Sequence, residues 1–314
     1  MTAISRRLPS VAESAACVAA LCLWLTVTAL GVGFRPEHTV MAVVIAALFF
    51  AAPATRRLTV ALIPFFLFGI SYDWMNLLPN YEVNLVDVRG LYETESALFG
   101  IGGLTPNEWW ALHTFKAADF IAGVFYLCWV PLPVIFGLWL YFSGRRNLYL
   151  HFAMVFLLTN LVGFTFYYIH PAAPPWYVAL HGFEAVPGTP GSAAGLEAFD
   201  AMTGLGIFDA LYARNSNVFA AMPSLHSAYT LTALLYALRG RGISLAWRLT
   251  LAVVTLGIWW TAVYTSHHYI LDVAGGIACS IAAYLIFEYA LMKWLAFDRF
   301  TIRYTNYISN GQQH

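Results

Sequence analysis

The sequence is poor in charge. Lys, Arg, Asp and Glu make up only 10% of its 314 residues, whereas a soluble domain has about 25%. Because 16 basic residues balance 16 acidic ones, the chain lacks the excess of basic residues that nucleic-acid binding requires. With 60% hydrophobic residues and a mean hydropathy of +0.67, it is predicted to be an all-α polytopic membrane protein.

Cysteine is also scarce. Cys17, Cys22, Cys128 and Cys279 all lie within apolar runs. They have neither the spacing of a metal site nor the loop placement of a disulfide framework. We therefore expect all of them to be packing residues.

Long apolar runs are what the sequence has in abundance. A helix needs about 20 apolar residues to cross a bilayer. The first run follows Arg6 and Arg7 as in a signal peptide, but it lacks a clear small-residue cleavage site and further runs follow it, so we expect an uncleaved helix. The runs predict a bundle of about eight transmembrane helices, at residues 11–33, 38–54, 57–78, 117–143, 148–170, 221–239, 245–263 and 269–293.

If these eight spans cross a membrane one after another, most of the basic residues fall on one side of it. With the N-terminus in the cytoplasm, twelve of the sixteen face inward and four face outward, the bias typical of membrane proteins. We therefore expect both termini to be cytoplasmic, in what we take to be a bacterial plasma membrane. The outer set is Arg35, Arg89, Lys116 and Arg214, and the inner set is Arg6, Arg7, Arg56, Arg57, Arg145, Arg146, Arg239, Arg241, Arg248, Lys293, Arg299 and Arg303.

Two long segments then lie outside the membrane. Residues 79–116 carry NEWW and HTFKAAD and predict an interfacial helix, with Trp109 and Trp110 at headgroup level. Residues 171–220 are rich in Pro and Gly and predict an irregular lid over a binding site. The chain thus divides into N-terminal helices at 1–78, the interfacial segment 79–116, a transmembrane core at 117–293 that includes the lid segment 171–220, and a cytoplasmic tail at 294–314.

Three polar residues stand at the outer ends of two predicted spans. AMPSLHSAYT places His226 at the start of one span, and SHHYILDVAGG places His268 and Asp272 at the start of another. Residues four apart on a helix share a face. Asp272 can therefore accept a hydrogen bond from one nitrogen of His268 and leave the other nitrogen as a nucleophile. His226 can then act as general acid and general base.

The helix start beside His226 predicts an anion site. Pro223 suits a first helical turn and Ser224 is a good cap. Free backbone N–H groups and the positive end of the helix dipole favour a phosphate there.

Two other interpretations of these residues remain open. Each histidine can be a structural, hydrogen-bonded residue at the membrane interface, although ionisable residues in membrane helices are functional candidates by default. A zinc site is the rival chemistry, but HHxxxD lacks the His pair at i, i+4 that helical zinc sites have. The possible zinc ligands are His226, His267, His268 and Asp272.

These segments resemble the motifs of a known family. AMPSLHSA is similar to the second motif of the type 2 phosphatidic acid phosphatase superfamily, usually PSGH, and HHYILDVAGG is similar to the third, whose core is HxxxD. HPAAPPWY, the Leu of PSLH and YTSHHYILD resemble most closely the fungal inositol phosphorylceramide synthase group and its bacterial relatives. The resemblance covers about residues 117–293 and implies the six-helix core of that superfamily.

The resemblance also implies a reaction. His268 would attack phosphorus to form a phosphohistidine, Asp272 would orient it, and His226 would serve as acid and then base, with no metal and no cofactor. The implied partners are a phospholipid donor such as phosphatidylinositol and a lipid hydroxyl such as that of ceramide. A lipid phosphate phosphatase that uses water is the alternative enzyme. A transporter or scaffold is the alternative without catalysis, but such a protein would have polar residues through the bilayer midplane.

The chain departs from the phosphatases of the superfamily in its cations. They have KxxxxxxRP as first motif and an Arg six residues before the nucleophilic His; here that position is Ala262, and Tyr167, Tyr168, His170 and Pro171 replace the first motif. Charge on the phosphoryl oxygens still needs stabilisation. The outer side offers Arg35, Arg89, Lys116, Arg214 and, if protonated, His170 and His267. Lys116 and Arg214 are the expected pair, and the alternative for each is an interfacial anchor that contacts lipid headgroups.

Two acids near the outer membrane surface are further candidates for the substrate site. Asp73 and Asp119 lie near the outer ends of predicted spans, where an acid is costly unless it is paired or hydrogen-bonded. Each can accept hydrogen bonds from the hydroxyl groups of a polyol such as inositol, or form an ion pair with Lys116. The full set of expected substrate-binding residues is Ser224, His170, Tyr168, Lys116, Arg214, Asp73, Asp119 and His267.

Overall fold

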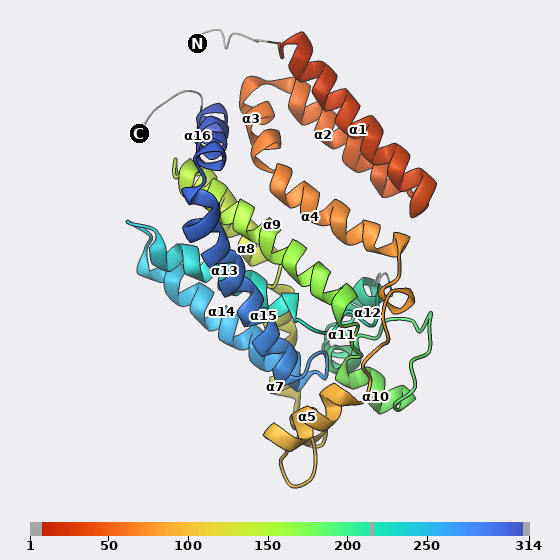
Figure 1. Ribbon diagram of the computed structural model, residues 1–314. Coiled ribbons are helices and arrows are strands. Elements are labelled where there is room, and N and C mark those ends of the chain that lie inside the picture. The colour runs from red at the N-terminus through yellow and green to blue at the C-terminus, as the bar shows by residue number, and fades with distance from the viewer. Residues whose placement is uncertain (1–7, 214–216, 310–314) are drawn as a thin grey trace.

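A computed structural model describes residues 8–213 and 217–309, and it is built from helices (Figure 1). Within these two ranges there is no β-strand, only isolated bridges such as the one between Asp87 and Ala172. The predicted all-α class is confirmed. In chain order the α-helices are α1 (Val11–Gly31), α2 (Pro36–Ala51), α3 (Pro53–Ala61), α4 (Ile63–Trp74), α5 (Gly90–Phe99), α6 (Pro106–Ala111), α7 (Lys116–Leu127), α8 (Pro131–Phe142), α9 (Arg146–Ile169), α10 (Pro175–His181), α11 (Glu197–Thr203), α12 (Ile207–Tyr212), α13 (Leu225–Arg239), α14 (Leu245–Tyr264), α15 (Ile270–Leu285) and α16 (Leu295–Ser309).

Four to six of these helices can cross a membrane by length and composition. Single helices that qualify are α1, α9, α14 and the stretch from α15 to Lys293. Two bent pairs can each make one more span: α3 with α4, bent by 49°, and α7 with α8, bent by 42°. The predicted spans 38–54 and 221–239 correspond to α2, with 16 residues, and α13, with 15 residues. The chain is thus an integral membrane protein, and its described residues hold four to six candidate spans.

Proline explains why two predicted spans are bent. The sequence predicted continuous helices at 57–78 and 117–143. Pro64 instead lies in the first turn of α4, and Pro131 begins α8. Proline has no N–H group and clashes with the preceding turn, so it is tolerated at a helix start and breaks a helix interior.

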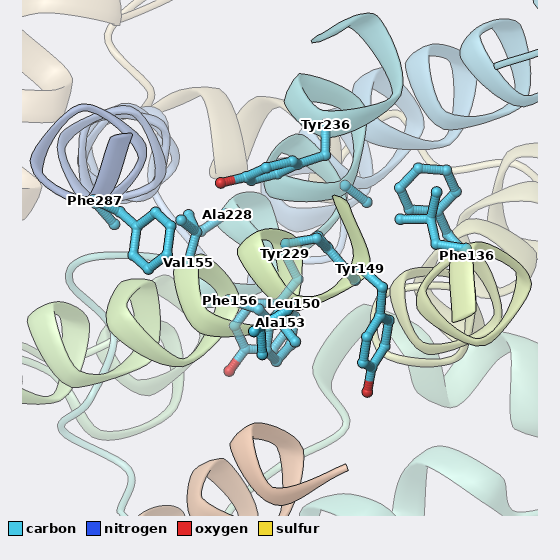
Figure 2. Packing of buried hydrophobic residues seen from close by; sticks show 14 of the residues in the cluster. Phe136, Tyr149, Leu150, Ala153, Val155, Phe156, Ala228, Tyr229, Tyr236 and Phe287 are labelled. Carbon is cyan, nitrogen blue, oxygen red and sulfur yellow. The ribbon is translucent and has the colours of Figure 1, made fainter. Parts of the chain in front are cut away.

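Helix α9 is the centre of the bundle. It packs against α4, α8, α13 and α15, and α13 in turn packs against α14 and α15. The largest cluster of buried apolar side chains lies among these helices and includes Phe136, Tyr149, Phe156 and Tyr236 (Figure 2). In a membrane, close packing of this kind holds helices together, because lipid tails are as apolar as the side chains. The cluster therefore holds α13 and the second half of α15 against α9.

The two long segments between the spans contain more helix than expected. Residues 79–116 form two short helices, α5 and α6, where one interfacial helix was predicted. The lid segment was predicted to be irregular, and this was wrong in part, since it contains α10, α11 and α12. For α10 the reason is positional: Pro175 is its first residue, where the missing N–H costs nothing.

Candidate active site

The starts of α13 and α15 meet and bring two imidazole rings together. Nδ1 of His226 lies 3.1 Å from Nε2 of His268. On its other side, Nδ1 of His268 lies 3.5 Å from Oδ2 of Asp272. The predicted trio therefore forms one continuous line of side chains.

The local structure around each helix start holds this line in place. The Ser224 side chain caps α13 by accepting a hydrogen bond from the Ser227 N–H at 3.4 Å. Its own N–H donates to the backbone carbonyl of Asp272 at 2.8 Å, which joins the start of α13 to the first turn of α15. Oδ2 of Asp272 accepts the Tyr269 N–H at 2.8 Å and so caps α15. Asp272 thus has a structural role in addition to its contact with His268.

Aromatic side chains hold the His226 ring. The Trp129 ring lies 4.3 Å and the Tyr126 ring 5.0 Å from it, centre to centre. The Tyr126 hydroxyl is in turn 2.8 Å from that of Tyr212, in the lid segment. Sequence reasoning missed these contacts, because the partners are far apart in the chain and nothing in the local pattern connects them.

His267 is buried beside the pair, with 4% of its surface exposed. Its Nδ1 lies 2.9 Å from the hydroxyl of Thr265. Burial, reinforced by the neighbouring His268, lowers the pKa of His267 to about 3. At neutral pH the ring is therefore uncharged, so it does not supply the cation that the sequence allowed for.

A cavity of about 180 Å³ opens onto the three histidines. Its walls come largely from α4, α9, α13 and the lid segment, and eight of its 19 lining residues are Phe, Tyr or Trp. Among the lining residues, all of which belong to the described part of the chain, none is Lys or Arg. The aromatic members of the lining are Phe68, Tyr72, Trp129, Phe164, Tyr167, Trp176, Tyr212 and Tyr229.

Several predicted substrate-binding residues lie outside the cavity lining. Tyr168 donates its hydroxyl to the carbonyl of Leu78 at 2.8 Å, and Nε2 of His170 lies 3.4 Å from Asp87. The adjacent Tyr167 lines the cavity instead.

The structure also shows what surrounds the predicted acids and cations. Asp73 pairs with Arg35 and lies 3.4 Å from Nε2 of His38. Asp119 accepts a hydrogen bond from the Tyr264 hydroxyl at 2.5 Å. Lys116 is exposed at the start of α7, and Arg214 lies outside the described residues. None of Asp73, Asp119 and Lys116 lines the cavity.

The described residues contain no group of three or more His, Cys, Asp and Glu side chains placed to hold a metal ion. They do contain two buried polar residues near the site that sequence reasoning missed. Glu95 accepts hydrogen bonds from the first turn of α15, and Asn107 donates to the carbonyl of His268. The only local signal for either was a polar residue within a partly apolar helix.

Comparison with known proteins gives a family and several relatives. Residues 89–286 match the model of the PAP2 superfamily. The chain is 52% identical over 307 residues to a phosphoinositol dihydroceramide synthase of Bacteroides thetaiotaomicron, covering 96% of this chain and 100% of that protein.

Fungal relatives are more distant. An inositol phosphorylceramide synthase of Candida albicans is 27% identical over 78% of this chain and 51% of its own length. The catalytic subunit of the Saccharomyces cerevisiae inositol phosphorylceramide synthase is 34% identical over 41% of this chain and 31% of its own length. No solved structure matches the chain.

Proposed function

The chain belongs to the PAP2 superfamily, and from this premise we propose that it transfers phosphoinositol from a phospholipid to the hydroxyl group of a ceramide-like lipid. The relative that matches over its full length is a phosphoinositol dihydroceramide synthase. The observation that carries the proposal is the 3.1 Å approach of His226 and His268 on the cavity wall. Two nitrogens that face each other this closely can act on the same phosphorus atom once a small movement lets it between them.

The first half-reaction forms a covalent intermediate. Nε2 of His268 attacks the phosphorus of the donor, and the bond from phosphorus to the diacylglycerol oxygen breaks. His226 gives its proton to that oxygen as the diacylglycerol leaves. Asp272, 3.5 Å from Nδ1 of His268, stabilises the positive charge that the ring acquires.

The second half-reaction runs in the opposite sense. The hydroxyl oxygen of the ceramide-like lipid attacks the phosphorus, His226 takes the hydroxyl proton, and the bond from phosphorus to His268 breaks. In the structure, Nδ1 of His226 lies directly beside Nε2 of His268. A phosphorus atom bonded to Nε2 would occupy that place, so the two rings must separate when the donor binds. We expect this movement to be small, since the starts of α13 and α15 are joined through Ser224.

The aromatic walls favour a lipid acceptor over water. A phosphohistidine open to solvent would be hydrolysed, so a transferase must exclude water from it. In this cavity the apolar lining surrounds the three histidines, and Trp176 of the lid segment forms part of it. We therefore assign residues 171–220 the role of a lid within a catalytic core at 117–293.

The same proposal includes an orientation in the membrane. We propose eight spans, with α2 and α13 completing the set, both ends in the cytoplasm and the site on the extracytoplasmic face. A second cavity supports this orientation, since it is lined by Arg145, Arg146, Arg239 and Arg241. Cations of this kind gather on the cytoplasmic side of membrane proteins. Helix α16 and the start of α1 lie at one end of the molecule and α5 and α10 at the other (Figure 1).

The test is a transfer assay with purified protein in mixed micelles. Phosphatidylinositol labelled in its headgroup is incubated with and without ceramide, and the products are separated into lipid and water-soluble fractions. We expect a new labelled lipid that depends on ceramide. Release of labelled inositol phosphate in both arms would mean that water is the acceptor and the protein is a hydrolase.

Variants assign the roles within that assay. His268→Ala and His226→Ala should each abolish turnover, and His268→Ala should also abolish labelling of the protein itself when ceramide is absent. His113→Ala is the matched control, because His113 is exposed on the surface and stacks on Trp109. Full activity in either of the first two variants would contradict the assignment.

A further inference from the structure

Glu95 is a buried acid that the proposed reaction does not use. It lies on α5, outside the bundle of long helices, and has 0% of its surface exposed. One carboxylate oxygen accepts the N–H of Ile270 at 2.8 Å and the other accepts the N–H of Leu271 at 3.1 Å. These are the first two residues of α15, whose N–H groups have no partner within the helix. The carboxylate also lies at the positive end of the α15 dipole.

Glu95 shares the start of α15 with Asp272. The N–H of Tyr269, just before the helix, donates to Oδ2 of Asp272 at 2.8 Å. The two carboxylates thus divide three neighbouring donors between them. Because Glu95 takes the donors of Ile270 and Leu271, Asp272 can remain turned toward Tyr269 and His268.

Asn107 holds the same loop from the other side. Asn107 is the second residue of α6 and has 2% of its surface exposed. Its side-chain N–H₂ donates to the carbonyls of Val263 and His268, each at 2.9 Å. One amide therefore ties the last turn of α14 to the backbone of the proposed nucleophile. Glu108, next to Asn107, accepts the Tyr92 hydroxyl of α5 at 3.0 Å, so α5 and α6 act as one unit.

We propose that Glu95 and Asn107 form a clamp that positions His268 and Asp272 for attack on phosphorus. Residues 79–116 are then a working part of the active site as well as a segment at the membrane surface. The inference rests on the proposed function in one respect, that His268 is the nucleophile. Neither residue lines the cavity, so both act through the backbone of the loop 263–271 and are positioning residues.

The test for Glu95 compares three variants in the transfer assay. Glu95→Ala leaves two buried N–H groups without acceptors, and a loop displaced by 1 Å costs about 100-fold in rate. We expect kcat to fall by about that factor while KM for the donor stays within about twofold, since the cavity walls are unchanged. Glu95→Gln keeps one acceptor oxygen and should recover part of the loss, leaving kcat about tenfold below wild type.

Glu93→Ala is the matched control for Glu95. It removes a carboxylate from the same helix, but this one is exposed and lies 3.4 Å from Arg89. It should leave kcat and KM unchanged. Glu95→Gln with wild-type kcat, or Glu95→Ala with a loss confined to KM, would overturn the clamp. The Gln variant is nearly isosteric, so it decides the question if Glu95→Ala does not fold.

Asn107 is tested in the same way. Asn107→Ala removes both hydrogen bonds to the loop and should lower kcat with little change in KM. Asn84→Ala is its control, because the Asn84 amide makes a similar bond, to the carbonyl of Tyr168 at 2.6 Å, away from α15. Equal kcat values for the Asn107 and Asn84 variants would refute the role of Asn107.

The clamp and the proposed function fail in different ways. Wild-type protein that releases inositol phosphate whether or not ceramide is present would end the transferase proposal, and the clamp would then be tested on the rate of that hydrolysis. Wild-type protein that makes the ceramide product, together with a Glu95→Gln variant equal to it, would end the clamp alone.

Discussion

A methyl group added at Gly276 tests how closely α13 and α15 must approach. A Cβ atom at this position would lie 2.0 Å from the carbonyl oxygen of Ser224 and 3.3 Å from Cβ of Ser227. Optimal contacts between non-bonded heavy atoms are about 3.5–4.0 Å. Because the nearest atom is backbone rather than a flexible side chain, α15 or the start of α13 has to move by more than about 1 Å.

This displacement falls directly on the proposed site. Gly276 lies one turn beyond Asp272 on α15, and Ser224 caps the helix whose second residue is His226. A shift of about 1 Å between reacting groups can cost about 100-fold in rate. Alanine is favoured over glycine in a helix by about 1 kcal/mol, but overpacking costs about 1–3 kcal/mol. The clash therefore outweighs the gain, and Gly276→Ala should lower both kcat and the unfolding temperature.

Gly275→Ala provides the control for this prediction. It adds the same methyl group to the neighbouring residue, where Cβ meets Cβ of Pro223 at 3.2 Å and a small adjustment suffices. We expect near wild-type kcat from this variant in the transfer assay, and an unfolding temperature in detergent that is not lowered, because the helix gains from alanine and the contact is mild. Wild-type kcat in Gly276→Ala would refute the idea that the close approach of the two helices sets the geometry of the histidines.

Three further predictions follow from the same site. Asp272→Asn should lower kcat by at least about 100-fold, since the amide cannot stabilise a positive His268 ring; single-turnover labelling of the protein checks this. His267 is held uncharged by burial with a pKa of about 3, while the unfolded chain protonates it below about pH 6.5. Stability should therefore decline as pH falls through this window, by up to about 1.4 kcal/mol per pH unit. His267→Gln should show a shallower decline when unfolding temperatures are compared at pH 7 and pH 5. Chelators should leave activity unchanged, and inhibition that added zinc reverses would revive the metal hypothesis.

The predicted trio could be found from the sequence because two of its members are close in the chain and the topology places the third beside them. His268 and Asp272 are four residues apart at a helix start, so their shared face follows from helix periodicity alone. His226 was placed at the same surface by counting spans. The prolines at positions 64 and 131 also had local meaning, and giving them more weight would have predicted the bends in the third and fourth spans.

The rest of the site depends on contacts between distant parts of the chain. The bond from Ile270 to Glu95 joins residues 175 positions apart, and the rings that hold His226 come from the end of α7 and the residues after it. Burial rather than residue type decides the charge of His267. No periodicity encodes these contacts, because each depends on which helices pack against the core around α9.

The chemistry of the cavity fits a phosphodiester better than a terminal phosphate. A phosphodiester carries one negative charge and a terminal phosphate close to two, and no Lys or Arg occurs among the described residues that line the cavity. Ala262, which stands where the phosphatases of the superfamily have an arginine, is fully buried, and its carbonyl accepts the N–H groups of His267 and His268 at 3.1 and 2.9 Å. The backbone of Ala262 therefore holds the loop that carries His267 and His268. A site built this way stabilises charge with a few oriented groups in an apolar enclosure, which suits a singly charged donor and an acceptor that brings its own hydroxyl.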